Sequence, residues 1–313
     1  MVSILNFGRK DKDSDGGQPV ENATEVAAFL QDFSIEVMPR TAAKVEDFTT
    51  QFSPGTRIYI AHIEGTPIED MVATAKRLTG DGFAVMPHFP ARIIASKDVL
   101  SEWVKMYADV GVSQALLLAG GLDKPVGDFH SSMQLLETGV FDKAGFANLH
   151  VAGHPEGNKD IDPDGSDKNV SEALHWKQSF SERTDAKMAI ATQFAFEADP
   201  VIEWVNAINA AGVDLPVHIG IAGPAKLQTM IKFALACGVG ASVRVLQRRA
   251  KDVTKLMLPF RPDEALSGLA AHKAANPDFG IEKVHFFPLG GIKTNAAYTH
   301  EFGLGPDVAQ ASA

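Results

Sequence analysis

Short apolar runs alternate with longer segments of helical periodicity along most of the chain. The runs predict strands at residues 33–38, 57–61, 83–87, 114–119, 146–151, 186–192, 215–221 and 284–288. Between them, apolar positions recur every three or four residues, as in helices that pack one face against a sheet. The pattern is typical of an α/β protein made of repeated strand–helix units.

Capping and turn residues mark where the predicted helices begin. Thr41, Ser96 and the pair Thr66-Pro67 each precede a helical segment, as cap and first-turn residues do. We predict helices at residues 22–32, 41–52, 66–78, 96–108, 130–137, 170–180, 199–211, 224–236 and 293–302, and a helical stretch over 241–275 interrupted by Pro259 and Pro262. The acidic, turn-rich segment 157–165 is predicted to be a loop.

The eight strand–helix units in one chain of 313 residues favour a single (β/α)8 TIM barrel. We place the barrel at residues 21–305, with extra helices before its last strand. Residues 1–20 are expected to be a flexible segment and residues 306–313 a tail. The alternative, a doubly wound sheet, has a glycine-rich phosphate-binding turn after its first strand, and none follows residues 33–38.

Composition and charge narrow the functional classes. Apolar residues make up 45% of the chain, and no window reaches the roughly 18 unbroken apolar residues that a membrane span needs. The net charge of −10 counts against nucleic acid and anionic membranes as partners. Because Cys237 is the single cysteine, an internal disulfide framework is excluded. Cys237 itself is expected to be a small core residue. With no signal-peptide pattern at the start, a cytoplasmic location is expected.

A carboxylate interrupts the first apolar run. Glu36 lies within Phe33–Met38, and Pro39 then ends the strand because proline cannot donate to a sheet ladder. Burial raises the pKa of a carboxyl, so we expect Glu36 to be a proton donor near neutral pH. The alternative is a structural ion pair with Arg40 or with a lysine from another loop.

Other polar residues and glycines stand where the predicted strands end. In a (β/α)8 barrel these ends share the face that holds the active site. The residues at or just beyond these ends are Glu36, His62, His88, Gly120, Gly121, His154, Glu156, Gln193, Gly220, Phe286 and Phe287. The histidines have no tight metal-ligand spacing, and neither GxSxG nor a plausible cysteine nucleophile is present, so we expect no metal and no acyl chemistry. A large polar organic ligand suits these walls better.

Several of these motifs, in the same order, resemble those of the methylenetetrahydrofolate reductases. Ser34–Thr41 is similar to the family's FEFFPPRT opening, and Ala191-Thr-Gln193-Phe194 to its ITQFFFD strand. Shorter matches are Pro87-His88 with PHLT, His154-Pro155-Glu156 with HPE, Leu174–Lys177 with LKxK, and His285-Phe-Phe287 with FHFYTLN. Together they run from about residue 33 to 290 at roughly the family's spacing.

The resemblance implies a (β/α)8 barrel that reduces 5,10-methylenetetrahydrofolate to 5-methyltetrahydrofolate with NAD(P)H, or runs the reverse oxidation, in one-carbon metabolism and methionine biosynthesis. It implies that Glu36 is the general acid that opens the methylene bridge to the iminium. It implies that the folate is bound by Gln193, His88, Phe286 and Phe287, with Gln193 also able to meet the nicotinamide. The cofactor would be held by His62, Gly120, Gly121, His154, Glu156 and Lys177.

The chain departs from the family where the family contacts its flavin. FAD usually relays hydride in these enzymes, yet Ala119 and Gly121 replace the Arg and Asp of the family's RGD segment. The loss of a charged hydrogen bond costs about 1.5–3 kcal/mol. These replacements count against FAD and favour a branch in which NAD(P)H, NADH in preference, gives hydride directly to the folate.

Two other functional classes stay open at this point. The chain could be a non-redox folate-binding methyltransferase or carrier, although a carrier needs no acid such as Glu36. It could also be a partner-binding scaffold on an enzyme fold, which the polar strand ends oppose. The direction of the reaction and the oligomeric state are left open.

Overall fold

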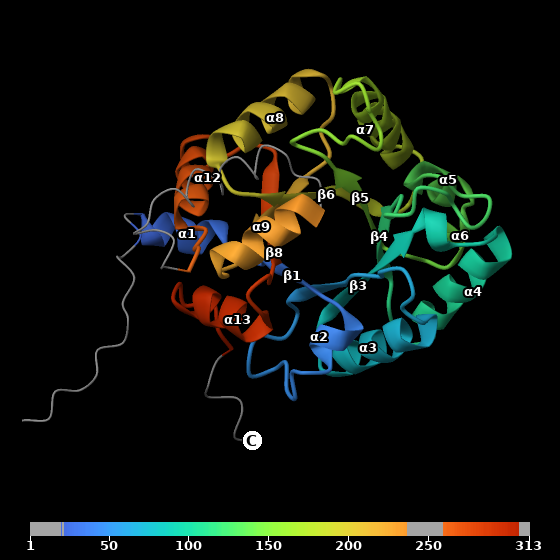
Figure 1. Cartoon of the computed structure of the whole chain (residues 1–313), viewed down its shortest axis with the longest axis horizontal. Helices are drawn as coiled ribbons and strands as arrows, with labels where there is room; N and C mark the ends of the chain where they lie inside the picture. Colours follow the sequence, from blue (N-terminus) through green and yellow to red (C-terminus); the bar gives the residue numbers. More distant parts are fainter. Residues whose placement is uncertain (1–19, 21, 237–258, 307–313) are drawn as a thin grey trace, which may run out of the picture.

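A closed barrel of eight parallel strands forms the centre of the computed structural model, with strand order β1-β2-β3-β4-β5-β6-β7-β8 (Figure 1). The structure describes residue 20 and residues 22–236 and 259–306. The strands are β1 Ser34–Val37, β2 Arg57–Ile60, β3 Ala84–Pro90, β4 Gln114–Leu118, β5 Asn148–Gly153, β6 Lys187–Ala195, β7 Val217–Ala222 and β8 Ile281–Phe287. The predicted (β/α)8 barrel is confirmed, and the doubly wound alternative is wrong.

Helices form an outer ring around these strands (Figure 1). They are α1 Ala23–Phe29, α2 Pro39–Ala42, α3 Ile68–Gly80, α4 Lys97–Ala108, α5 Ser132–Glu137, α6 Val140–Lys143, α7 Lys168–Ser181, α8 Ala198–Ala210, α9 Leu227–Ala236, α12 Asp263–Ala275 and α13 Ile292–His300, with a 3-10 turn η1 at Ala91–Ile93. Ser96 caps α4 as predicted, since its side chain accepts a hydrogen bond from the Val99 amide. Pro67, rather than Thr66, is the N-cap of α3.

The predicted helix at residues 41–52 is wrong. Helix α2 ends at Ala42, and Thr41 lies at its third position, where its hydroxyl accepts a hydrogen bond from the Met38 amide. Beyond it, the Asp47 carboxylate accepts hydrogen bonds from the amide and hydroxyl of Thr49, which favours a turn over a helix. Val45 and Phe48 are still buried, as their apolar character predicted.

Several predicted boundaries differ from the observed ones. Strands β3 and β6 run past His88 and Gln193, so these side chains belong to the barrel wall rather than to loops. The short helix α6 was not predicted. Cys237 and residues 241–258 of the predicted helical stretch lie outside the described residues, as do 1–19 and 307–313 of the predicted terminal segments.

The barrel wall has one layer of side chains on its outer face and another on its inner face. Outward-facing residues such as Ile35, Ile58, Ile219 and Val284 pack against the helices in one large apolar core. The barrel interior is instead partly polar and contains the buried residues Ser34, Tyr59, His150, His218 and His285. Among the helices of the described residues, none is long and apolar enough to cross a membrane.

Candidate active site

A cavity of about 1510 Å³ opens at the carboxyl ends of the barrel strands. Residues from the ends of β1, β3, β4, β5, β6 and β8 line it, together with the loops that follow them. It exceeds the roughly 300–1,000 Å³ of most small-molecule sites. The cavity therefore has room for two substrates side by side, in the place where barrel enzymes carry out their chemistry.

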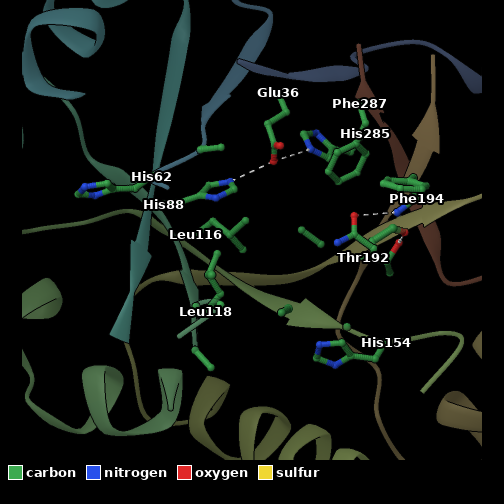
Figure 2. A pocket seen from close by; sticks show the side chains of 18 of the residues that line it. Glu36, His62, His88, Leu116, Leu118, His154, Thr192, Phe194, His285 and Phe287 are labelled. Carbon is green, nitrogen blue, oxygen red and sulfur yellow. Dashed lines mark hydrogen bonds and ion pairs between the residues drawn. The ribbon is translucent and has the colours of Figure 1, made fainter. Parts of the chain in front are cut away.

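Glu36 projects from β1 into this cavity between two histidines (Figure 2). Its Oε2 lies 3.3 Å from Nε2 of His88 on β3 and 3.9 Å from Nε2 of His285 on β8. The Glu36 side chain is 20% exposed. In the part of the chain that the structure describes, the partners of its carboxylate are these histidines, and neither Arg40 nor a lysine pairs with it.

The pKa of Glu36 is lowered, so the expectation of a raised pKa is wrong. Burial would raise it, but the electrostatic interactions of the carboxylate with the neighbouring His285 and His88 side chains outweigh burial. Burial lowers the pKa of His88 to about 4, so His88 is neutral at pH 7. Its Nε2 has no hydrogen-bond partner among the residues described. The site therefore presents a carboxylate beside a neutral imidazole.

His285 was missed by the sequence analysis, which selected Phe286 in its place. The His285 ring packs at 4.8 Å from Phe287, and its Nδ1 lies 3.0 Å from Oγ of Ser34. Phe286 faces the other way, is fully buried and packs against Phe33 and Tyr298 in the outer core. Its position does not support substrate binding. The two-residue period of a strand is the signal that places His285 and Phe287 on one face.

Gln193 lines the cavity at an irregular point of β6. The register with β7 shifts between Ala191 and Phe194, and the Thr192 hydroxyl bridges the shift by donating to the Gln193 carbonyl and accepting from the Gly220 amide. This bulge fixes the backbone that carries the Gln193 amide.

We expect Gly220→Ala to destabilise the protein by about 1–3 kcal/mol, as overpacking does. A Cβ at Gly220 would lie 2.6 Å from the carbonyl oxygens of Thr192 and Gln193, so the bulge would have to move. Urea unfolding measures the free energy. Gly80→Ala is the control, because a Cβ there meets nothing within 4 Å. Equal stability of Gly220→Ala and wild type would contradict this account of the bulge.

The residues predicted to hold a cofactor are divided between two sides of the cavity. His62 points away from Glu36 (Figure 2), packs against Trp103 with ring centroids 5.1 Å apart, and has its Nε2 3.0 Å from the Thr66 carbonyl. Its contacts are those of a scaffold residue at the cavity edge. Gly120 and Gly121 line the cavity after β4 and bring no charge.

Lys177, His154 and Glu156 lie together on the β5 side of the cavity. Lys177 reaches from α7 and donates from Nζ to the Ala152 carbonyl at 2.8 Å. Burial lowers the pKa of Lys177 to about 8, and burial, with the Lys177 charge, lowers that of His154 to about 4. A buried ammonium with one carbonyl partner is suited to receive an anionic group of a ligand.

Arg92 joins three loops at the cavity edge and was also missed. It donates to the carbonyls of His130 at 3.2 Å and Leu122 at 2.8 Å, and pairs with Asp160 at 2.8 Å. Because these contacts occupy its guanidinium, Arg92 acts by positioning the β4 and β5 loops. No group of three or more His, Cys, Asp or Glu side chains in the described residues is arranged to hold a metal ion.

The protein is a closed (β/α)8 barrel whose acid–base side chains converge on a large cavity at the strand ends, which is the arrangement of the (β/α)8-barrel enzymes. The chain is similar to a 5,10-methylenetetrahydrofolate reductase of Pectobacterium carotovorum subsp. carotovorum, with 24% identity over 251 residues that cover 77% of this chain and 76% of that protein. No family model matches the chain. The resemblance to the methylenetetrahydrofolate reductases is confirmed at 24% identity, and it supports an oxidoreductase at the level of the family.

Proposed function

We propose that the protein transfers hydride between NAD(P)H and 5,10-methylenetetrahydrofolate, forming 5-methyltetrahydrofolate or running the reverse oxidation. The observation that carries the proposal is Glu36 between His88 and His285, at the mouth of a barrel related to a reductase of that name. The balanced reaction joins NAD(P)H, one proton and the methylene folate to give NAD(P)⁺ and the methyl folate. A site for it must therefore deliver one proton and hold two flat ring systems.

Glu36 supplies the proton in this proposal. Protonation of a bridging nitrogen breaks its bond to the methylene carbon and leaves an iminium, which then accepts the hydride. The lowered pKa keeps Glu36 ionised near neutral pH, so it becomes an acid only when bound folate covers its remaining 20% exposure and desolvation raises its pKa. Folate binding and protonation of Glu36 are thereby coupled.

Aromatic side chains and the Gln193 amide provide a place for the pterin. Phe287 packs at 5.3 Å from Phe194, and both line the cavity next to His285. A pterin needs a flat apolar contact and an edge that donates and accepts hydrogen bonds, which an amide supplies. We assign the folate to Phe287, Gln193 and His88.

The opposite side of the cavity suits a dinucleotide. Lys177 is placed to pair with a diphosphate, and the glycine-lined end of β4 admits a ring close to the backbone. NAD(P)H and FAD share the diphosphate, so these residues fit either one, and FAD when bound would supply a hydride relay. The uncharged Ala119-Gly120-Gly121 segment favours NADH as the direct donor.

The visible spectrum of the purified protein, with and without added FAD, followed by an NADH oxidation assay with methylenetetrahydrofolate, tests the proposal. We expect NADH consumption that depends on the folate and no flavin absorbance, which supports direct transfer. A flavin band bleached by NADH would keep the reaction and replace the direct route by a relay. No flavin and no consumption would overturn the proposal in favour of a non-redox folate binder.

A further inference from the structure

The barrel interior below Glu36 is filled with titratable side chains. Such interiors are normally packed with branched apolar residues, because unpaired polar groups cost free energy when buried. Here Tyr59, His150, His218 and His285 are each at most 3% exposed. In the parallel pairing of the strands, Glu36 lies beside Tyr59, Ala191 beside His218, and Gly220 beside His285.

The lower end of this column reaches solvent. Nε2 of His218 lies 3.1 Å from the Glu282 carboxylate, whose side chain is 52% exposed near the start of β8. The His218 ring meets the His150 ring edge to face, with centroids 4.6 Å apart. Nδ1 of His218 is buried without a hydrogen-bond partner in the described part of the chain. A nitrogen in that state calls for a water or a transient proton partner.

The upper end reaches the active site. Oη of Tyr59 and Nδ1 of His150 are 2.6 Å apart and share a hydrogen bond. The Tyr59 ring packs against the His285 ring at 4.3 Å, and Nε2 of His285 lies 3.9 Å from Oε2 of Glu36. From Glu282 to Glu36, each side chain therefore contacts the next one in the column, from the amino end of the barrel to its carboxyl end.

We propose that this column, Glu282–His218–His150–Tyr59–His285, conducts protons through the barrel between solvent and Glu36. The inference rests on the proposed function, in which each reduction moves one proton from Glu36 to the folate. The carboxylate left behind must be protonated again, and bound ligands block the cavity side. A path from the opposite end of the barrel returns a proton to Glu36 while bound ligands close the cavity.

Proton balance along the path is simple. A neutral imidazole accepts a proton on one nitrogen and releases another from its second nitrogen, and a phenol does the same through its oxygen. Three junctions lack a hydrogen bond, namely the ring contacts His218–His150 and Tyr59–His285 and the 3.9 Å separation of His285 and Glu36. A proton crosses them when a ring turns or a water enters. Burial lowers the pKa of His150 and His218, which keeps both rings neutral and able to relay.

Fixed charges surround the lower end of the column. Arg57 donates to Gln114 at 3.0 Å, and its charge acts on His150, His218 and Tyr59. Lys283, whose charge also acts on His150, pairs with Asp32 at 3.6 Å. These cations disfavour a proton resting on the histidines, so protons pass through rather than accumulate.

Tyr59→Phe and Glu282→Gln test the path in the full-length enzyme. Tyr59→Phe removes one oxygen and keeps the ring, and Glu282→Gln keeps the size of a side chain that is 52% exposed. We expect each variant to lower kcat by about tenfold or more, within the range of general acid–base effects, with KM changed less than about twofold. The solvent deuterium isotope effect on kcat should rise, which a packing defect would not produce.

Asp32→Asn is the matched control, since Asp32 is an exposed carboxylate at the same end of the barrel that pairs with Lys283 and lies outside the column. It should leave kcat and the isotope effect unchanged. A second readout does not need activity: NMR of protein labelled with ¹⁵N-histidine gives the rate at which the His150 ring proton exchanges with water. We expect this exchange to slow in Glu282→Gln.

The outcomes separate the path from the folate reaction. If the wild-type protein is inactive on folate but the His150 ring proton exchanges more slowly in Glu282→Gln than in wild type, the path stands and the proposed function is overturned. An active wild type with unchanged kcat, isotope effect and exchange in the variants would overturn the path alone. If Tyr59→Phe does not fold, Glu282→Gln with its control decides.

Discussion

Replacement of Glu36 by glutamine is expected to lower kcat by about 10²–10⁴-fold, the usual contribution of a general acid. Glutamine has the size of the native side chain and can still meet His88 and His285, but it cannot donate a proton to the folate nitrogen. The fold should persist, because the change removes a charge from a site that is otherwise well packed. Steady-state NADH oxidation with methylenetetrahydrofolate, and the KM of each substrate, measure the effect.

Glu64→Gln provides the matched comparison for this variant. Glu64 is an exposed carboxylate in the loop after β2, close to the barrel mouth, and does not line the cavity. It should retain full activity. If Glu36→Gln turns over within about threefold of wild type, far below a general-acid effect, the acid role of Glu36 is wrong.

The fold could be predicted because it follows from a repeated local signal. Each strand is a short apolar run and each helix has its own periodicity, so eight repetitions outweigh an error in any one of them. The false helix at residues 41–52 shows where this fails: apolar spacing at Val45 and Phe48 was correct, but the Asp47 side chain satisfies the backbone locally. Periodicity does not register that competition.

The site was predictable at the level of strand ends but not at the level of partners. Glu36 and Gln193 were found because a polar residue in an apolar run is conspicuous. The lowered pKa of Glu36 depends on His285, which comes from a strand 249 residues away and meets β1 only because the barrel closes. Arg92 was missed for the same reason, because its partners lie on two later loops.

Stability is expected to fall steeply as the pH decreases from about 6.5 to about 4, the range between the ordinary histidine pKa and the pKa of His88 and His154. In this range the unfolded chain binds protons on these side chains and the folded chain does not. The unfolded state therefore gains stability as the pH falls. Each such histidine contributes up to about 1.4 kcal/mol per pH unit.

His62, His150 and His218 act in the same direction, because burial also lowers their pKa. His175, whose pKa is raised by the carbonyls of Ser171 and Ala211, acts the other way from an exposed position. Glu36 adds a loss only below its ordinary pKa of 4.5, because its pKa in the folded protein is lowered. Because a folded protein is typically stable by only about 5–15 kcal/mol, the loss from the buried histidines is a large fraction of that free energy.

Urea unfolding at a series of pH values measures this dependence. His88→Gln removes one of the groups, so the slope of the unfolding free energy between pH 6.5 and 4.5 should decrease by up to about 1.4 kcal/mol per pH unit. His175→Gln, at an exposed position, should not reduce the slope. An unfolding free energy that stays constant across this range would show that the histidines take up protons without unfolding, and that the barrel interior is more open to water than its burial indicates.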